Sequence, residues 1–234
     1  MKLRKTLIVD GAAVKLVSED IRLDLYAPGR AVFQVQSETA LSGAVTFAMG
    51  YSTEDRDQAF FTGYVERSLT VDKAQQRLLC RELTGVLDAD LPVSLRHPML
   101  SDVLAAYAGL TGLAFAVPDR TYAKTRVPCF MALGSGYHGL DSLGGVFGID
   151  DYIWLQQGDG SVFVGSWHDS RWADRPVAIE ETWFSGVTAD GGARLPVLPA
   201  LRPGTRINNK YLLRLQLIGS EMVVQCARQL KKPF

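Results

Sequence analysis

Residues 61–83, FTGYVERSLTVDKAQQRLLCREL, decide the fold class of the first part of the chain. From Tyr64 to Arg67 the side chains alternate between two faces, which is the two-residue period of a β-strand. The segment DKAQQ then turns the chain into a second apolar run, RLLCREL. This pattern predicts neighbouring strands of a β-meander, in which consecutive antiparallel strands pair.

Strand-like patterns extend from this stretch toward both ends of the chain. Before it, IRLDLY alternates apolar and polar residues, and Pro28–Gly29 marks a turn before another alternating run. Near the end, KYLLRLQLIGSEMVVQC predicts a hairpin that turns at Gly219–Ser220. One face of its first strand is expected to carry Tyr211, Leu213, Leu215 and Leu217.

The middle of the chain carries the helices. HPMLSDVLAAYAGLTG (residues 97–112) has apolar residues at helical spacing, with Pro98 where a helix begins and Gly109 and Gly112 where one ends. LAFAV follows as a strand, and DYIWLQQGDGSVFVGSW predicts a hairpin that turns at residues 158–160. Residues 132–152 repeat the helix–glycine–strand design at one offset, which matches Asp102 with Asp141, Leu104 with Leu143, Gly109 with Gly148 and Leu110 with Ile149.

The predicted fold class is therefore α+β and mainly β. We expect a first β domain at residues 1–90, an α/β insertion with two short helices at 91–170, and a second β domain at 171–234.

The composition argues against partners that are bound through net charge, although a local basic patch stays open. Lysine plus arginine and aspartate plus glutamate both total 25, so the formal net charge is zero. Such a chain gains no long-range attraction to nucleic-acid phosphates or anionic lipid, and no apolar run is long enough to span a bilayer. We therefore expect no membrane embedding and no specific nucleic-acid binding. Cys80, Cys129 and Cys226 lie apart in apolar contexts and are expected to be core thiols.

The stretch ALGSGYHGLDSLGGVFGIDDY (residues 132–152) resembles a nucleotide-binding motif. Gly134, Gly136 and Gly139 satisfy G-x-G-x-x-G. A dinucleotide site needs a long helix after this loop, and we expect the glycines at 144, 145 and 148 to end the helix after about two turns. A small-residue helix packed closely against a neighbour explains the same glycines, so we expect no cofactor.

Two pairs of acids and three histidines are the remaining candidates for chemistry. Glycosidases use two facing carboxylates, but neighbours in a strand point to opposite faces, so Asp150–Asp151 and Glu180–Glu181 each supply at most one. His97, His138 and His168 lack metal-ligand spacing, although a site formed in space stays open. Ser166, His168 and Asp169 are sequence neighbours, whereas catalytic triads form from distant segments. We expect no catalytic residue and no metal ligand.

Three stretches together resemble the tail-hub family of bacteriophages. This family comprises the late-control protein D type, the Mu-like baseplate hub and the hub part of type VI secretion spikes. The first motif is a G-x-V strand with Gly63 and Val65, followed by an R-E strand end at Arg81–Glu82. The second is LSDVL (residues 100–104), leading into TGLAF. The third is LRPGTRINNKYLLRLQLIG, with Pro203, Gly204 and Tyr211 in place. The resemblance covers about residues 55–225.

The resemblance implies a structural protein of the virion tail tip or baseplate, assembled in the host cytoplasm. Family members form homotrimeric rings in which each chain carries two tube-like β-barrel domains. Three chains then present six similar domains, which adapts a hexameric tail tube, through which DNA is ejected, to a trimeric spike or fibre. The expected partners are therefore two more copies, the tube or distal tail ring, and the spike. The alternative is a tail-associated cell-wall hydrolase that uses Asp150, Asp151, Glu180 or Glu181.

The segment from Asp190 to Gly204 is longer than an ordinary hairpin connection. It is rich in Gly and Pro, and its apolar residues are poorly suited to lie free in water. We expect this loop to dock on a neighbouring subunit or an adjoining ring; the alternative is that it packs on its own domain. The residues concerned are Leu195, Val197, Leu198 and Leu201, with Arg194, Arg202 and Arg206 on or beside the loop.

Overall fold

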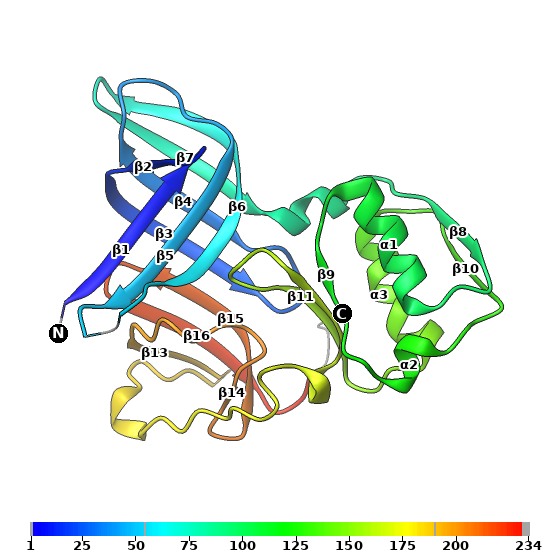
Figure 1. The fold of residues 1–234 in the computed structure, drawn as a ribbon. Helices are drawn as coiled ribbons and strands as arrows, with labels where there is room; N and C mark the ends of the chain where they lie inside the picture. The colour runs from blue at the N-terminus through cyan, green and yellow to red at the C-terminus, as the bar shows by residue number, and fades with distance from the viewer. Residues whose placement is uncertain (1, 54, 190, 231–234) are drawn as a thin grey trace. The chain divides into compact units, whose positions relative to one another are not determined.

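The computed structural model describes residues 2–53, 55–189 and 191–230 (Figure 1). The chain divides into two compact units. Unit 1 combines the chain up to residue 83 with the chain from residue 175 onward, and unit 2 is Thr84–Asp174. The two outer segments of the chain therefore share one unit and one sheet.

Unit 1 is built on a large antiparallel sheet. Its strand order is β13-β16-β15-β3-β4-β7-β6-β5-β1-β2, with β14 paired to β15. The strands are β1 (Leu3–Val9), β2 (Ala12–Val14), β3 (Leu16–Asp24), β4 (Arg30–Gln36), β5 (Ala44–Tyr51), β6 (Gln58–Asp72), β7 (Gln75–Glu82), β13 (Gly192–Pro196), β14 (Arg206–Ile207), β15 (Lys210–Ile218) and β16 (Glu221–Ala227). The stretch at 61–83 forms the β6–β7 hairpin, so the predicted meander is confirmed.

The part of the sheet from β1 to β7 curls on itself, because residues 12–24 form one extended segment that pairs with strands at both ends of the strand order. Residues 12–14 pair with β1, and the chain continues directly into β3, which pairs with β4. The order β1-β5-β6-β7-β4-β3 therefore returns to its starting strand (Figure 1). Alternating side chains from these strands fill the inside of the curl. Phe33 contacts Phe47 and Phe61 there, with ring centroids 5.6 and 6.0 Å apart.

The C-terminal segment extends this sheet and shares its core. β15 pairs with the second half of β3, and β16 and β13 follow. The predicted turn at Gly219 is confirmed, with φ +55°. The prediction that the odd-numbered residues 211–217 share one face of β15 is wrong, because the register shifts between Leu212 and Arg214. This bulge places Leu212 in the core together with Leu215 and Leu217.

The expectation of a docking loop before Gly204 is contradicted; Asp190 itself lies outside the described residues. Residues 192–196 form β13, which pairs with β16. Leu195, Val197 and Leu201 are buried in the unit 1 core, and Leu198 packs against it. Pairing with the chain's own sheet satisfies the backbone and removes these side chains from water, so they are not available to another subunit.

Unit 2 combines three helices with short strands. The helices are α1 (Leu100–Thr111), α2 (Thr121–Lys124) and α3 (Gly136–Phe147). The strands are β8 (Val93–Arg96), β9 (Phe115–Ala116), β10 (Cys129–Ala132), β11 (Tyr152–Gln156) and β12 (Val162–Ser166). β8 pairs with β10, and β9, β11 and β12 form a second sheet. The predicted β11–β12 hairpin is confirmed.

Two details of the predicted helices are wrong. α3 continues for 12 residues through Gly144 and Gly145, because glycine weakens a helix without ending it where tertiary packing supports it. Gly109 lies inside α1, and the left-handed residue that ends this helix is Gly112, with φ +73°. The structural counterpart of Gly148 is therefore Gly112, so the offset proposed for the repeat is also wrong.

Candidate functional site

Two of the three stretches that resemble the tail-hub family, residues 61–83 and 201–219, meet in unit 1 at a buried ion pair, whereas LSDVL lies in α1 of unit 2. The Arg202 guanidinium donates from Nη2 to Glu82 Oε1 at 3.2 Å, and both side chains are 5% exposed or less. Arg202 Nη1 also donates to the Phe60 carbonyl. The second carboxylate oxygen, Glu82 Oε2, accepts from the Gly29 N–H at 2.6 Å. The pair thus joins the end of β7 to β6, to the turn before β4 and to the C-terminal segment.

The Pro203–Gly204 motif explains how Arg202 reaches this site. The Thr205 N–H donates to the Arg202 carbonyl at 3.1 Å, which closes a four-residue turn. Proline fits the second position of such a turn, and Gly204 has φ +93°, which the third position of a type II turn requires. The Gly204 N–H then donates to the Leu212 carbonyl at 2.8 Å, so the turn is tied to β15.

Two glycines leave room for the ion pair and the strand that carries it. A Cβ on Gly29 would lie 2.8 Å from the Glu82 carboxyl carbon. Gly63 pairs with Glu82 in the β6–β7 ladder, and a Cβ there would lie 2.0 Å from the Arg81 carbonyl oxygen. The G-x-V, R-E and P-G motifs therefore form one structural junction, which we call the motif junction: Gly29, Gly63, Glu82, Arg202, Pro203 and Gly204.

The electrostatics of the motif junction are those of a structural pair. Burial raises the pKa of Glu82 above its ordinary value, while the nearby Arg202 charge and the Gly29 N–H oppose the rise. Burying two charges is costly, and the hydrogen bonds to Phe60 and Gly29 offset part of that cost. A fully buried pair of this kind holds chain segments in register and is closed to a substrate.

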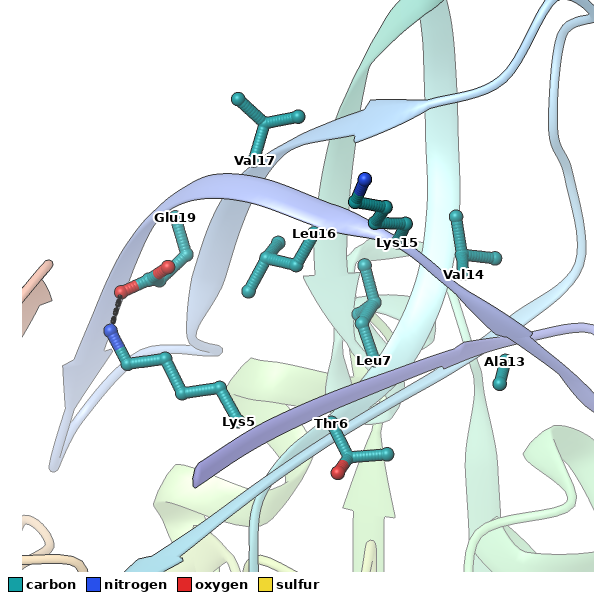
Figure 2. Close-up of a pocket in the computed structure, with 9 residues that line it drawn as sticks. All are labelled: Lys5, Thr6, Leu7, Ala13, Val14, Lys15, Leu16, Val17 and Glu19. Atoms are coloured by element: carbon teal, nitrogen blue, oxygen red, sulfur yellow. Dashed lines mark hydrogen bonds and ion pairs between the residues drawn. The ribbon is translucent and has the colours of Figure 1, made fainter. Parts of the chain in front are cut away.

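An open cavity of about 440 Å³ lies beside β1, β2 and β3 (Figure 2). It occupies the place where β3 diverges from β1, and Figure 2 shows Leu7 and Leu16 pointing into the gap between the two strands. Lys5 closes one end: its ammonium pairs with Glu19 and donates to the Gly219 carbonyl at 2.7 Å. The lining residues are Lys5, Thr6, Leu7, Ala13, Val14, Lys15, Leu16, Val17 and Glu19. This set offers an ion pair and aliphatic walls, without an arrangement of nucleophile and base.

The glycine motif in unit 2 serves helix packing. A Cβ on Gly136 would lie 2.8 Å from Leu87 Cδ2, and a Cβ on Gly139 would lie 1.8 Å from the Tyr107 hydroxyl oxygen. The Gly136 N–H at the start of α3 already donates to the Ala89 carbonyl at 3.1 Å. Neighbouring side chains therefore fill the space beside Gly136 and Gly139, which accounts for the glycines at these two positions. Gly134 is different, because its nearest neighbour would be His138 at 3.9 Å.

The candidate acids belong to different units. Asp150 is exposed, and Asp151 Oδ2 lies 2.8 Å from His168 Nε2 on the surface of unit 2. Glu180 and Glu181 are exposed in unit 1, where Glu180 accepts from the Thr182 hydroxyl at 3.4 Å. None of these four acids is among the residues that line the cavity of Figure 2.

The three sequence neighbours at positions 166, 168 and 169 make contacts with different partners. Ser166 Oγ accepts the backbone N–H of His168, while the His168 ring pairs with Asp151. Asp169 instead accepts from Arg120 and Tyr122, at 2.7 and 2.9 Å. The described residues contain no group of three or more His, Cys, Asp or Glu side chains able to hold a metal ion.

The three cysteines differ in environment. Cys80 is buried in the unit 1 core, and burial raises its pKa to about 12. Cys226 is half-buried, and its pKa is raised to about 11 for the same reason. The expectation of a core thiol is wrong for Cys129, which is exposed on β10. Alternation along that strand buries Phe130 and Ala132 instead.

Solved structures with this fold are phage tail proteins and a type VI secretion protein. The 43 kDa tail protein of prophage MuSo2 from Shewanella oneidensis superposes with a TM-score of 0.69 at 11% identity, covering 97% of this chain and 98% of that chain. A tail protein from Neisseria meningitidis gives 0.66 at 11% identity, covering 97% and 96%. An E. coli component of the type VI secretion system, described as structurally similar to the T4 tail proteins gp27 and gp5, gives 0.60 at 11% identity, covering 97% and 79%.

The chain therefore has the fold of the phage tail-hub proteins, and the resemblance predicted from its motifs is confirmed. A curated protein of Haemophilus phage HP1, described as an uncharacterized 58.7 kDa protein in the lys 3′ region, is 34% identical over 225 residues. The match covers 96% of this chain and 42% of the relative, so the chain spans less than half of that protein's length. No protein-family model matches the chain. Together the comparisons show a fold shared with phage tail proteins and a relative that is encoded by a phage.

Proposed function

We propose that the chain is a structural hub subunit of a phage or prophage tail tip or baseplate. Three copies form a ring that joins the hexameric tail tube, or the distal tail ring, to a trimeric spike or fibre. The fold shared with tail proteins over 97% of the chain carries this proposal. The closed motif junction supports it, because the residues that mark the family hold the sheet together and are shielded from solvent.

The reason for proposing a ring of three chains is a difference in symmetry between the tail tube and the spike. A trimer can match a six-fold tube if each chain contributes two similar positions to the ring. In this proposal the curled β1–β7 region provides one position and the β13–β16 region provides the other, with the helical part of residues 84–174 as an insertion. The hub role proposed here requires no catalysis, and the candidate acids lie on the surface, with Asp151 paired to His168. No helix among the described residues is long and apolar enough to cross a membrane.

The mass of the purified protein in solution tests the proposal. Light scattering coupled to size-exclusion chromatography should give a particle of three times the 25.6 kDa chain mass. A protein that stays monomeric at every concentration measured, including the highest one it tolerates in solution, would contradict the ring.

A peptidoglycan-clearing assay tests the hydrolase alternative. We expect no clearing by the wild-type protein. Clearing that is lost in Asp151→Asn or Glu180→Gln, with the folded state retained, would replace the hub proposal with a cell-wall hydrolase.

A further inference from the structure

Strand β10 of unit 2 has one open edge. It pairs only with β8 among the described residues, with Cys129 opposite Arg96 and Met131 opposite Ser94. At the two ends of this ladder, the His97 N–H donates to the Pro128 carbonyl and the Leu91 N–H donates to the Gly134 carbonyl. Because hydrogen-bonded and non-hydrogen-bonded pairs alternate in an antiparallel ladder, the even-numbered residues of β10 direct their backbone groups to β8. The N–H and C=O groups of residues 129, 131 and 133 therefore point to the open edge.

The same residues carry exposed apolar side chains. Met131 is 65% exposed and Leu133 is 72% exposed, and Cys129 is exposed beside them. The opposite face of the strand is closed, since Phe130 and Ala132 are buried. Proteins usually protect an open edge with a charged side chain, a bulge or a covering segment. Residues 129–133 contain no charge, so this edge combines unpaired backbone groups with an apolar face.

Charge distinguishes the two ends of this edge. At the Cys129 end, Arg96 is exposed on the neighbouring strand, and the Arg126 side chain is 61% exposed. Arg126 is directed to this end by a hydrogen bond of 2.7 Å to the His97 carbonyl. At the other end, Asp90 is exposed and bridges to Ser135, which follows β10. An occupant is therefore attracted when it carries a carboxylate near Arg96.

We propose that the open edge of β10 binds an extended segment of a partner protein by strand addition. A row of outward N–H and C=O groups is satisfied by an extended strand and not by a helix. The segment carries apolar side chains at alternate positions, beside Met131 and Leu133, and an acidic residue beside Cys129, on the face from which the long side chain of Arg96 can reach across β10. This surface goes beyond the ring contacts of the proposed function.

A second copy of the chain is the competing occupant. Two β10 edges could pair only about a two-fold axis, with Met131 opposite Met131 of the other copy. A two-fold axis makes both faces of an assembly identical, whereas a ring between a tube and a spike has two different faces. The preference for a different protein therefore rests on the proposed function, but strand addition itself does not.

Fluorescence anisotropy with labelled peptides tests the proposal on the full chain. The probes are seven-residue peptides with valine at alternate positions, ending in two glutamates or in two lysines, each made in both end-to-end orders. One glutamate peptide should bind at least fivefold more tightly than either lysine peptide. Arg96→Glu should reverse this preference, because the charge beside the bound end changes sign.

Two substitutions at the centre of the edge separate strand addition from apolar contact. Met131→Pro removes an outward N–H without touching the ladder to β8, and it should weaken binding at least tenfold. Met131→Leu keeps both the backbone and the apolar face and should bind as the wild type does. Circular dichroism spectra of the three proteins should coincide.

Several results would overturn the proposal. These are no binding of any peptide to the wild type, equal binding by Met131→Pro, or a preference that Arg96→Glu leaves unchanged. Formation of a disulfide dimer by Cys129→Ser/Met131→Cys in the absence of peptide would identify a second copy as the occupant; the serine removes the exposed thiol that lies beside the new cysteine. The hub proposal is tested separately, since Met131→Pro should keep the trimer mass. A monomer that still binds the peptides would refute the hub and leave strand addition intact.

Discussion

The two units use different chemistry to bring distant segments together. Unit 1 joins its outer segments through a buried ion pair between Glu82 and Arg202, inside a continuous sheet. Unit 2 brings its segments together through glycines, with Gly139 against Tyr107 and Gly136 against Leu87. In the first case a charged pair fixes the register, and in the second the absence of a side chain permits close approach. Motifs that resemble chemistry in the sequence serve architecture in both units.

Removing one member of the ion pair should have the largest effect on stability. Arg202→Met leaves Glu82 buried without its partner, and we expect it to lower the free energy of unfolding by about 3–5 kcal/mol. Urea denaturation followed by circular dichroism measures this change.

The double variant Glu82→Gln/Arg202→Met is the matched control. It removes the uncompensated charge while the glutamine oxygen still accepts from Gly29, so it should recover at least half of the loss. A single variant that costs less than about 1 kcal/mol would show that the pair does not hold the sheet.

The corresponding change in unit 2 is Gly139→Ala. The new methyl group would collide with the Tyr107 hydroxyl, which outweighs the gain in helix propensity, so unfolding should become easier by about 1–3 kcal/mol. Gly145→Ala is the control in the same helix, because a Cβ there meets nothing within 4 Å. It should stabilise the protein by up to about 1 kcal/mol.

Tyr107→Phe sharpens this test. The Tyr107 hydroxyl is buried without a hydrogen-bond partner among the described residues, so its removal should cost little. In the Tyr107→Phe background, Gly139→Ala should lose part of its effect, because the oxygen 1.8 Å from the new Cβ is gone while the ring carbon Cζ stays 2.6 Å away. A cost that is larger in the Tyr107→Phe background than in the wild type would refute the packing explanation of the glycine.

The ion pair of Lys5 and Glu19 beside the cavity of unit 1 should contribute less to the free energy of unfolding than the motif junction does. Lys5→Met removes the partner of Glu19, whose side chain is 4% exposed, and should cost about 1–2 kcal/mol. Hydrogen exchange should become faster in β1 and at the Gly219 turn, whose carbonyl also loses its donor, and should stay unchanged at the far ends of β15 and β16. Faster exchange throughout unit 1 would mean that Lys5 supports the whole sheet.

Alkaline pH should weaken unit 1 through Cys80. Burial raises the pKa of this thiol from 9.0 to about 12, so the folded state holds the proton more tightly than the unfolded state. Its contribution is complete below pH 9 and is lost as the pH rises toward 12, which amounts to about 1 kcal/mol at pH 10. Urea denaturation at pH 8 and pH 10 should show this loss, and Cys80→Val should reduce it. The same loss in Cys80→Val would assign it to other groups.

Local patterns in the sequence predicted much of the fold. Two-residue alternation gave the β6–β7 and β15–β16 hairpins, and Gly219 gave a turn, because these features depend on residues close in sequence. The bulge at Leu212 and strand β13 were missed, since each depends on the register of a partner strand. β13 was hidden in a Gly/Pro-rich segment, whose leucines were the one signal of a buried strand.

The candidate site shows the same limit. Of the motif junction, Gly63, Glu82, Arg202, Pro203 and Gly204 lie in the stretches that carried the resemblance, whereas Gly29 was predicted only as a turn residue. Nothing in their spacing places Glu82 beside Arg202, because the contact spans more than half of the chain. The helix glycines were correctly assigned to packing, whereas the position of Cys129 depended on which face of β10 meets the helices.

Electron cryomicroscopy of the purified, assembled protein tests the hub proposal most directly. The proposal predicts a ring of three chains in which six similar β positions surround a central channel, so averages should show three-fold symmetry with approximate six-fold features. A ring of six chains, or particles without a closed ring, would contradict it.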